Sequence, residues 1–574
     1  MELNNNKINW RELGLLLLVA FVVLAAGIGL RDPWPADEPR FTLVAKQMIE
    51  SGNWLIPHRG SELYSDKPPL FMALQAAAYT LTHVWRVAFL LPSLLAGLGM
   101  IVLVYDLARR VFDHRTGLWA AGALLCAFQF VYQVKRAQID PTVSFFVTLA
   151  NYGLLRHFLL GPNWRAYWLG MFAAGLGVIT KGVGVLALLM FAPYLFALWR
   201  GWNGVARNPD RFGVRWLGGA LAFAAAAALW LGPMFWYVHA QGSSEYLAYR
   251  DDILFHQTAG RYTESWDHHQ PPWYYLGVIA TSWLPLTLAL PWLVPEWRRR
   301  LLARDARFLL PLSWIVIIVI FFTFPKGKRD VYIMPALPWL GFCAGPFLAS
   351  IVRRPAFRAL AFALIVALGV TALGVGVYAL ATHPPFAVKL AQQRGLANGG
   401  AALWYVAIGL GLVALAAALA FRPRRGVHAL VAGLAGVWLV WSFGAYPVLN
   451  DSSSAAGVMR RAGEIIGPDA ELALVAWKEQ NLLHADRPVR DFGFQTHWPQ
   501  QLAAGMAWLR EAPQRRWLFV NEEALGDCVD KARSIYVGHA NRREWWLVRT
   551  AALVPGCEPL AVPAPVEDDP NAPD

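Results

Sequence analysis

Residues 402–421 read ALWYVAIGLGLVALAAALAF, a run without a single charge, and RPRR follows at 422–425. A helix rises about 1.5 Å per residue, so such a run crosses a hydrocarbon core about 30 Å thick. The whole chain has 574 residues, of which 57% are hydrophobic and 16% are charged. Its mean hydropathy of +0.38 exceeds that of ordinary soluble proteins. The sequence therefore predicts a polytopic α-helical membrane protein.

Similar apolar blocks recur along most of the chain. Their length and composition predict about thirteen transmembrane helices. The approximate ranges are 12–30, 87–106, 117–134, 141–160, 166–180, 183–199, 216–238, 274–294, 308–324, 331–350, 359–381, 402–421 and 427–447. An odd number of spans places the two ends of the chain on opposite sides of the membrane.

Arginine is concentrated in alternate connections between these blocks, at 109–115, 200–215, 298–307, 353–358 and 422–425. The positive-inside rule makes these connections cytoplasmic, together with the N-terminus, and places everything after Tyr446 outside. The apolar run 68–82 is short for a span, and a crossing there would reverse this topology. We therefore predict interfacial helices within 39–82 on the outer face.

The chain divides near residue 450. Residues 1–449 form the predicted transmembrane domain, which includes an outer loop at 240–272. Within 450–561 the apolar blocks shorten to strand length, at 472–477, 516–520 and 545–548, which predicts a small α/β outer domain. Residues 562–574 are rich in proline and acid and predict a disordered tail. Cys528 and Cys557 lie in the outer domain and can pair if it faces an oxidising compartment.

The formal net charge of +13 does not indicate nucleic acid, because lysine and arginine are spread through the loops and form no basic domain. Anionic membrane lipid is the partner that this charge favours. A second set of cations breaks the positive-inside rule, since it falls in predicted outer loops. The set comprises Arg40, Lys67, Lys135, Arg136, Lys181, Arg261, Lys326, Lys328 and Arg329. Each can be a solvated loop charge, but together they can bind the phosphate of a membrane-embedded substrate.

The first outer loop, Trp34-Pro35-Ala36-Asp37-Glu38-Pro39-Arg40, places acids beside these cations. Either acid can cap a helix that begins at Pro39, where a negative charge favours the helix dipole. Alternatively, a carboxylate near cations can accept a proton from a hydroxyl nucleophile. Capping and catalysis can also be divided between Asp37 and Glu38.

Further acids recur downstream. Tyr64-Ser65-Asp66-Lys67-Pro68-Pro69-Leu70 sets Asp66 and Lys67 before two prolines, which hold the lysine in extended backbone. Asp140 precedes Pro141 and can either cap a helix or act in a site. The outer loop contains Arg261 and three histidines, His256, His268 and His269. With nearby acids, the histidines can bind a divalent metal, or they can simply be exposed.

These motifs resemble those of bacterial lipid A aminoarabinose transferases, within the protein O-mannosyltransferase-like group of GT-C glycosyltransferases. The resemblance rests on the order of Asp37-Glu38-x-Arg40, Tyr64-x-Asp66-Lys67-Pro68-Pro69-Leu70, Asp140, the His256 to Arg261 loop and Lys326-Gly327-Lys328 followed by Tyr332. It covers most of the membrane region.

The resemblance implies an enzyme of the bacterial inner membrane, with its active site and outer domain in the periplasm. Such an enzyme transfers a sugar from undecaprenyl phosphate, with inversion, to lipid A or another periplasmic acceptor, and the sugar implied is 4-amino-4-deoxy-L-arabinose. Asp37 and Asp140 are the implied catalytic residues. The implied donor-phosphate ligands are Arg40, Tyr64, Lys67, Arg261 and Tyr332. Asp66, where relatives commonly have Glu, and His256 are implied ligands of a divalent metal.

Other functions fit parts of this pattern. A related GT-C enzyme can move another lipid-linked sugar to protein, lipopolysaccharide core or another polymer, and no residue decides the sugar or the acceptor. A transporter or lipid flippase also has many spans, but its charges are expected near the membrane midplane. A sensor that uses only its outer domain leaves the acidic and basic motifs unexplained.

Overall fold

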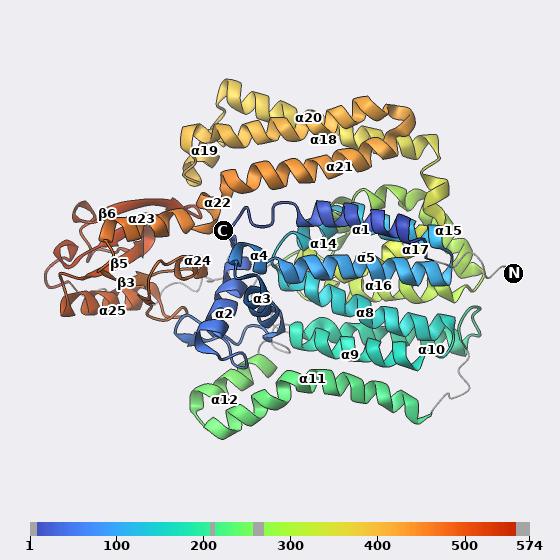
Figure 1. The fold of residues 1–574 in the computed structure, drawn as a ribbon, viewed down its shortest axis with the longest axis horizontal. Helices are drawn as coiled ribbons and strands as arrows, with labels where there is room; N and C mark the ends of the chain where they lie inside the picture. The colour runs from blue at the N-terminus through green and yellow to red at the C-terminus, as the bar shows by residue number, and fades with distance from the viewer. Residues whose placement is uncertain (1–7, 207–212, 256–268, 558–574) are drawn as a thin grey trace.

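The computed structural model describes residues 8–206, 213–255 and 269–557. Long helices lie side by side with their axes roughly aligned and form a bundle. A small sheet domain lies at one end of this bundle (Figure 1). The N-terminal end of α1 lies at the opposite end of the bundle. The two ends of the predicted transmembrane domain are therefore separated as an odd number of spans requires.

The bundle consists of α-helices joined by short 3-10 segments and one π segment. In chain order these are α1 (Trp10–Ala25), α4 (Trp85–Ala88), α5 (Leu91–Val111), α6 (His114–Cys126), α7 (Phe128–Val134), α8 (Ile139–Leu160), α9 (Trp164–Thr180), η2 (Gly182–Met190), α10 (Phe191–Trp199), α11 (Val214–Gln241), α14 (Tyr274–Ser282), η4 (Leu286–Ala289), α15 (Leu290–Leu302), α16 (Ala306–Thr323), η5 (Asp330–Ala336), α17 (Leu337–Ile351), α18 (Pro355–Thr382), α20 (Ala401–Phe421), η7 (Pro423–Arg425), α21 (Gly426–Val440), η8 (Trp441–Ala445) and α22 (Tyr446–Ser454).

Each predicted span coincides with one of these helices or with a consecutive pair. Among the described residues, 9 helices are long and apolar enough to cross a membrane, or up to 11 if each of two bent pairs is one span. The two remaining predicted spans correspond to α1 and α9, which have 16 and 17 residues. The predicted fold class, a polytopic helical protein with a small C-terminal sheet domain, is confirmed.

Three predicted spans differ in detail from the helices observed. The first helix ends at Ala25 rather than at residue 30, because Gly27 and Gly29 adopt positive φ values of 83° and 87°. The span predicted at 117–134 is bent by 68° between α6 and α7, where Ala127 is extended. The span predicted at 274–294 is bent by 96° between α14 and the η4–α15 segment, next to Pro285, whose ring removes a backbone donor.

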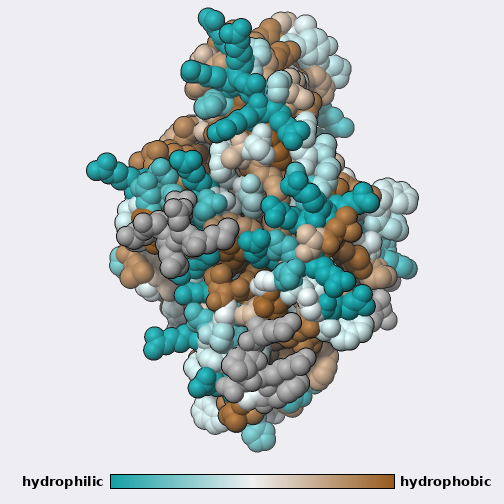
Figure 2. All heavy atoms as spheres, turned by 90° about the vertical axis from the view of Figure 1, so that its right-hand side faces the viewer, coloured by the Kyte–Doolittle hydropathy of each residue, from teal (hydrophilic) through white to brown (hydrophobic). Residues whose placement is uncertain are grey.

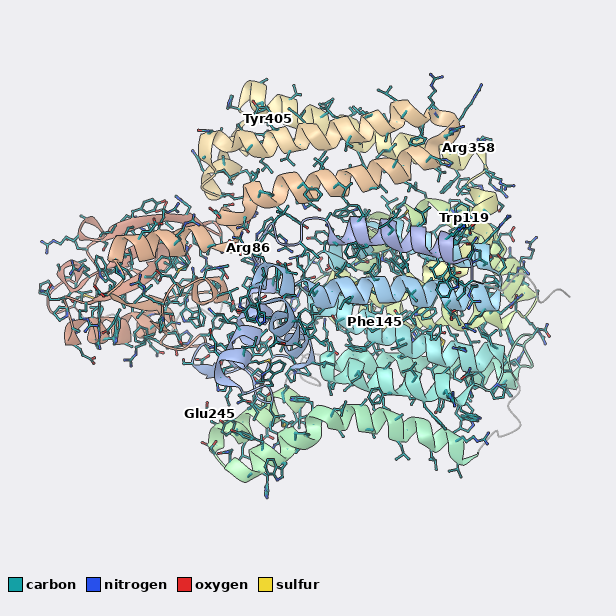
Figure 3. The ribbon with its side chains drawn as sticks, viewed as in Figure 1. Arg86, Trp119, Phe145, Glu245, Arg358 and Tyr405 are labelled. Carbon is teal, nitrogen blue, oxygen red and sulfur yellow. A yellow bond between two sulfur atoms is a disulfide. The ribbon has the colours of Figure 1, made fainter. Side chains whose placement is uncertain are left out.

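The described residues of the arginine-rich connections lie at the end of the bundle away from the sheet domain. Figure 2 shows this end face, where hydrophilic side chains gather over apolar flanks. Arg358, from one such connection, lies at this end in Figure 3, whereas Arg86 lies beside the sheet domain. Arg358 and the sheet domain therefore lie at opposite ends of the bundle, and the predicted orientation in the membrane stays a prediction.

A layer of short elements lies between the bundle and the sheet domain. Its first part comprises α2 (Glu38–Ser51), the antiparallel pair β1 (His58–Arg59) and β2 (Glu62–Leu63), and α3 (Leu70–Thr82). Three further elements project at the same end: α12 (Ser244–Asp251), α19 (Pro385–Gln393) and η6 (Ala397–Gly400). Phe41, Val44 and Met48 of α2 pack with Phe71 of α3 in one buried cluster. Leu43 instead joins the core of the sheet domain, so α2 is covered on both faces by protein.

The C-terminal domain is a five-stranded sheet in the order β4-β3-β5-β7-β6, with β3 parallel to β4 and β5, and β7 antiparallel to β5 and β6. The elements are α23 (Ala456–Ile466), β3 (Glu471–Val475), α24 (Glu479–Leu483), β4 (Val489–Arg490), α25 (Trp498–Glu511), β5 (Arg516–Asn521), η9 (Glu522–Ala524), η10 (Lys531–Arg533), β6 (Ile535–Ala540), β7 (Arg543–Val548) and η11 (Thr550–Ala552). The three predicted strands correspond to β3, β5 and β7. The predicted tail at 562–574 lies outside the described residues.

Alternation along the strands explains why helices cover both faces. Leu472 and Leu474 of β3 pack on one face with Val458 of α23. Val475, from the other face of the same strand, packs with Leu502 and Met506 of α25. Side chains of a strand point alternately to the two sides of the sheet, and here both sides are buried.

Cys528 and Cys557 form a disulfide that closes a loop of sequence separation 29 in this domain. We expect Cys528→Ser to destabilise the sheet domain by about 2–4 kcal/mol, because the unfolded chain regains the freedom that the crosslink removes. Chemical denaturation of the purified protein, followed by the fluorescence of the sheet domain, measures this loss. Cys126→Ser, at a cysteine outside the disulfide, is the control and should leave the transition of this domain unchanged. Equal midpoints for wild type and Cys528→Ser would contradict the expectation.

Candidate functional site

Asp37 lies at the start of α2, where the bundle meets the short outer elements. It occupies the N-cap position, yet its side chain makes no capping hydrogen bond. Oδ1 accepts a bond of 3.0 Å from Arg40, and Oδ2 accepts bonds of 3.0 Å from both Gln138 and Arg329. Only 8% of the residue is exposed. The carboxylate therefore belongs to a cationic cluster, and the capping interpretation of Asp37 is wrong.

Glu38 has a structural role. It is 1% exposed and forms a two-pronged ion pair with Arg31, in which Nη2 donates to Oε1 over 2.7 Å. Its oxygens also accept the backbone N–H groups of Trp34 at 2.8 Å and of Ala137 at 2.9 Å. Glu38 thus joins the first outer loop to the segment after α7. The two neighbouring acids divide their tasks, as the sequence allowed, but Glu38 holds two loops together rather than capping α2.

Electrostatics keep Asp37 ionised. Burial alone would raise the pKa of its carboxyl group, because a dry environment disfavours charge. The nearby guanidinium groups of Arg329 and Arg40 outweigh burial and hold the pKa of Asp37 well below its usual range. The same contacts raise the pKa of Arg40 and Arg329 against the opposing effect of burial. The site therefore combines an ionised carboxylate with charged guanidinium groups.

Arg40 is the centre of a larger ionic network. Besides Asp37 it contacts Asp66, with Nη1 3.6 Å from Oδ2, and Glu479, with Nε 3.7 Å from Oε1. Arg59 contacts the same two acids through Nη1, at 3.4 Å from Asp66 and 3.7 Å from Glu479. Asp66, from the segment between β2 and α3, and Glu479, from the C-terminal domain, therefore converge on two arginines.

Asp140 belongs to a neighbouring part of this cluster. It lies in the first turn of α8, and its Oδ1 is 2.6 Å from Nζ of Lys181, which follows α9. That ammonium group is 4.9 Å from the ring centroid of Tyr332. Asp140 also acts electrostatically on Arg329, the partner of Asp37. The structure thus brings Asp37, Asp140 and Tyr332 into one region, and the roles predicted for them stay predictions.

Tyr64 and Lys67 lie on the segment that follows the β1–β2 hairpin. Tyr64 is completely buried, and its hydroxyl has no hydrogen-bond partner among the described residues. Burial raises the pKa of that hydroxyl, so it remains a neutral donor. Nζ of Lys67 donates to the carbonyl oxygen of Asp66 over 2.7 Å.

The remaining cations of the predicted outer set have varied positions. Nζ of Lys135 is buried and donates to the carbonyl oxygens of Val23 and Ala26 at the end of α1, so its role is structural. Lys328 donates to the carbonyl oxygen of Gln270 over 3.0 Å. Arg261 and His256, implied as phosphate and metal ligands, lie outside the described residues.

The metal site therefore stays a prediction. In the part of the chain that the structure describes, no group of three or more His, Cys, Asp or Glu side chains could hold a metal ion. Asp66 is engaged by Arg40 and Arg59, which compete with a metal for its oxygens. We derive no chemical step from a metal.

Sequence reasoning missed several members of the cluster. Lys181 and Arg329 were recognised only as misplaced outer cations, and no role was predicted for Gln138, Arg59 or Glu479. For Lys181 and Arg329, the signal in the sequence was the excess of cations in the predicted outer loops. Glu479 had none, because it lies in a different domain from the acids and arginines that it joins.

Comparisons with known proteins agree with this arrangement. Residues 66–231 match the family described as dolichyl-phosphate-mannose-protein mannosyltransferase. The chain is 30% identical over 365 residues to the undecaprenyl phosphate-alpha-4-amino-4-deoxy-L-arabinose arabinosyl transferase of Pseudomonas aeruginosa strain LESB58, across 60% of this chain and 61% of that protein. The transferase of the same description from Pectobacterium carotovorum strain PC1 is 28% identical over 377 residues, across 63% and 65%. The matched region spans less than two thirds of either relative.

The fold resembles a solved structure over nearly the whole chain. The crystal structure of ArnT from Cupriavidus metallidurans bound to undecaprenyl phosphate has a TM-score of 0.73 at 20% identity, covering 94% of this chain and 98% of that one. The apo state of the same protein gives a TM-score of 0.71.

Fold and site together define a multi-pass membrane protein with a small C-terminal sheet domain and a buried ionic cluster between bundle and sheet. Within that class, the chain is similar to the bacterial undecaprenyl phosphate-aminoarabinose transferases, and the resemblance drawn from its motifs is confirmed.

The Arg31–Glu38 pair makes a stability prediction. We expect Arg31→Met to destabilise the protein by about 3–5 kcal/mol, because it leaves the buried Glu38 carboxylate without its cation. Arg460→Met is the control: Arg460 pairs with Asp451, and the two side chains are 61% and 64% exposed, so we expect a loss of about 0–1 kcal/mol. Thermal unfolding in detergent compares the two variants. Similar losses for both would show that burial of the Arg31–Glu38 pair does not matter.

Proposed function

We propose that this protein is an inverting glycosyltransferase of the bacterial inner membrane. It transfers 4-amino-4-deoxy-L-arabinose from undecaprenyl phosphate to lipid A at the periplasmic face. The observation that supports this most strongly is the buried, ionised Asp37, held beside Arg40 and Arg329 instead of capping its helix. The similarity to transferases of that description supports the donor. Lipid A is the acceptor that the resemblance of the motifs implies.

The chemistry needs one carboxylate and a cationic leaving-group site. A hydroxyl oxygen of the acceptor attacks the anomeric carbon, and the bond from that carbon to the phosphate oxygen breaks. The departing lipid phosphate carries the developing negative charge, which Lys67, Lys181 and the arginines stabilise in a partly dry environment. No second carboxylate is needed to protonate a phosphate, which distinguishes this site from the acid pair of a glycoside hydrolase.

The low pKa of Asp37 determines the stage of the reaction at which its carboxylate accepts the hydroxyl proton. A weakly basic carboxylate does not deprotonate a free alcohol, but it accepts a hydrogen bond from the hydroxyl group and orients it. The hydroxyl becomes strongly acidic once its oxygen bonds to the anomeric carbon. Asp37 then takes the proton late in the step, when proton transfer is downhill.

The position of the charges favours a transferase over a transporter. Arg40 lies on α2, Asp37 directly precedes α2, and Asp66 lies between β2 and α3, so all three belong to the layer of short elements between the bundle and the C-terminal domain (Figure 1). A transporter would be expected to hold its charges near the middle of the spans. The disulfide of the C-terminal domain supports a periplasmic location, since such bonds persist in oxidising compartments.

Asp37→Asn tests the proposed reaction. We expect sugar transfer to fall by a factor of about 10² to 10⁴, because the amide cannot accept the hydroxyl proton. Mass spectrometry of lipid A, after incubation of the reconstituted protein with the lipid-linked sugar, measures the transfer. The exposed Glu523→Gln is the control and should retain wild-type turnover. Wild-type turnover by Asp37→Asn would remove Asp37 from the mechanism, and no transfer by the wild type would refute the proposed function.

The pH dependence tests the role of Arg329. With both arginines present, Asp37 stays ionised under mildly acidic conditions, so its protonation should not limit the wild-type rate there. Arg329→Gln removes the largest stabilising charge, so the pKa of Asp37 rises under the remaining influence of burial. We therefore expect the acidic limb of kcat/KM to move to higher pH in Arg329→Gln. An unchanged limb in a pH series of transfer rates would contradict this account of Asp37.

A further inference from the structure

The C-terminal domain holds the hairpin that precedes the Tyr64 to Lys67 segment. Ser61 Oγ donates to Asp491 over 2.6 Å, and the backbone N–H of Gln495 donates to Glu62 over 3.2 Å. Gly60, at a positive φ of 66°, lies so close to Trp477 that an added Cβ would be 2.8 Å from its ring. The position of the hairpin thus depends on the C-terminal domain.

The same domain also packs against α2, the helix that carries Asp37 and Arg40. Leu43 is 2% exposed and lies in a cluster with Met459 and Leu472 of the C-terminal domain. Nζ of Lys46 donates to the carbonyl oxygen of Leu483 at the end of α24 over 3.4 Å. One short helix, α24, therefore faces the start of the proposed catalytic helix.

Glu479, the first residue of α24, extends this contact into the charged cluster. It is 5% exposed, and its Oε1 lies 3.7 Å from both Arg40 Nε and Arg59 Nη1. These distances are too long for hydrogen bonds, so the contacts are ionic. The Arg59 guanidinium is also fixed from the other side, since it lies 3.9 Å from the ring centroid of Phe494 of the same domain.

Arg40 thus has a different acid at each of its three nitrogens. Nη2 contacts Asp37, Nη1 contacts Asp66, and Nε contacts Glu479. Removing the Glu479 charge leaves Asp37 and Asp66 as the acids paired with Arg40 among the described residues, and both lie at its Nη atoms, so the guanidinium group loses its ionic contact on the Nε side. Because Arg40 binds Asp37 directly, its displacement changes the position of the proposed proton acceptor.

We infer that Glu479 is a positioning residue for the transfer reaction. Through Glu479, the C-terminal domain fixes the positions of Arg40 and Arg59 relative to Asp37. This inference rests on the proposed function. The C-terminal domain then has a hydrophobic core of its own and also forms one side of the active site. Glu479 does not touch the reacting atoms; it acts through Arg40.

The test compares Glu479→Gln, which keeps the shape of the side chain but removes its charge, with Glu479→Asp, which keeps the carboxylate. The control is Glu523→Gln, at an exposed acid of the same domain. For each reconstituted variant we measure kcat and donor KM, the stoichiometry and affinity of undecaprenyl phosphate binding, and the thermal unfolding temperature. A displacement of about 1 Å in an active site can cost about a hundredfold in rate.

We expect Glu479→Gln to lose about tenfold to a hundredfold in kcat, while one lipid phosphate still binds per chain and the unfolding temperature stays close to that of the wild type. Glu479→Asp should recover part of the loss, and Glu523→Gln should behave as the wild type. Wild-type kcat in Glu479→Gln would overturn the inference. So would a loss that is fully explained by fewer binding-competent molecules, since that indicates a role in folding only.

Measurements on the wild type distinguish a failure of this inference from a failure of the proposed function. If the wild type transfers sugar and Glu479→Gln does so equally well, the positioning role of Glu479 fails alone. If the wild type binds undecaprenyl phosphate but transfers no sugar from the lipid-linked donor, the proposed function fails, and the positioning role fails with it.

Discussion

The ion pairs around Arg40 are the constraint on which the site depends. Burying a charge is costly unless an opposite charge accompanies it, and the layer between bundle and C-terminal domain buries several. Each of these charges contacts an opposite charge: Arg329 pairs with Asp37, Asp37 pairs with Arg40, and Arg40 pairs in addition with Asp66 and Glu479. Elements from distant parts of the chain must therefore meet at this layer with their charges matched.

This arrangement allows a largely apolar bundle to hold a charged site at one of its ends. The bundle provides long helices whose ends present polar groups at the edge of the apolar region. The short outer elements then exclude water from the cluster without requiring charges inside the spans. In such a layer, fixed cations stabilise a departing phosphate more strongly than they would in water. The bent pairs α6–α7 and α14–α15 show that the bundle is not a simple set of straight spans.

Two neighbouring acids illustrate how context assigns a role. Asp37 and Glu38 have the same charge and similar burial, and both precede Pro39. Glu38 meets Arg31 and two backbone N–H groups, which makes it a link between loops. Asp37 meets two arginines and an amide from three different segments, on the side where Asp140 and Tyr332 also gather. The difference arises from the direction of each side chain at the start of α2.

The sequence alone determined the helical fold, three strands of the C-terminal domain and the acidic and basic motifs that contain Asp37 and Asp140, whereas the orientation that it predicts from charge stays a prediction. These features follow from local apolar length, alternation and charge, so neighbouring residues suffice to predict them. Only the tertiary structure decided that Glu38 is structural, that Lys181 pairs with Asp140, and that Glu479 reaches Arg40. Ion pairing between distant segments depends on how helices and domains pack, and no local pattern in the chain encodes which opposite charges will meet.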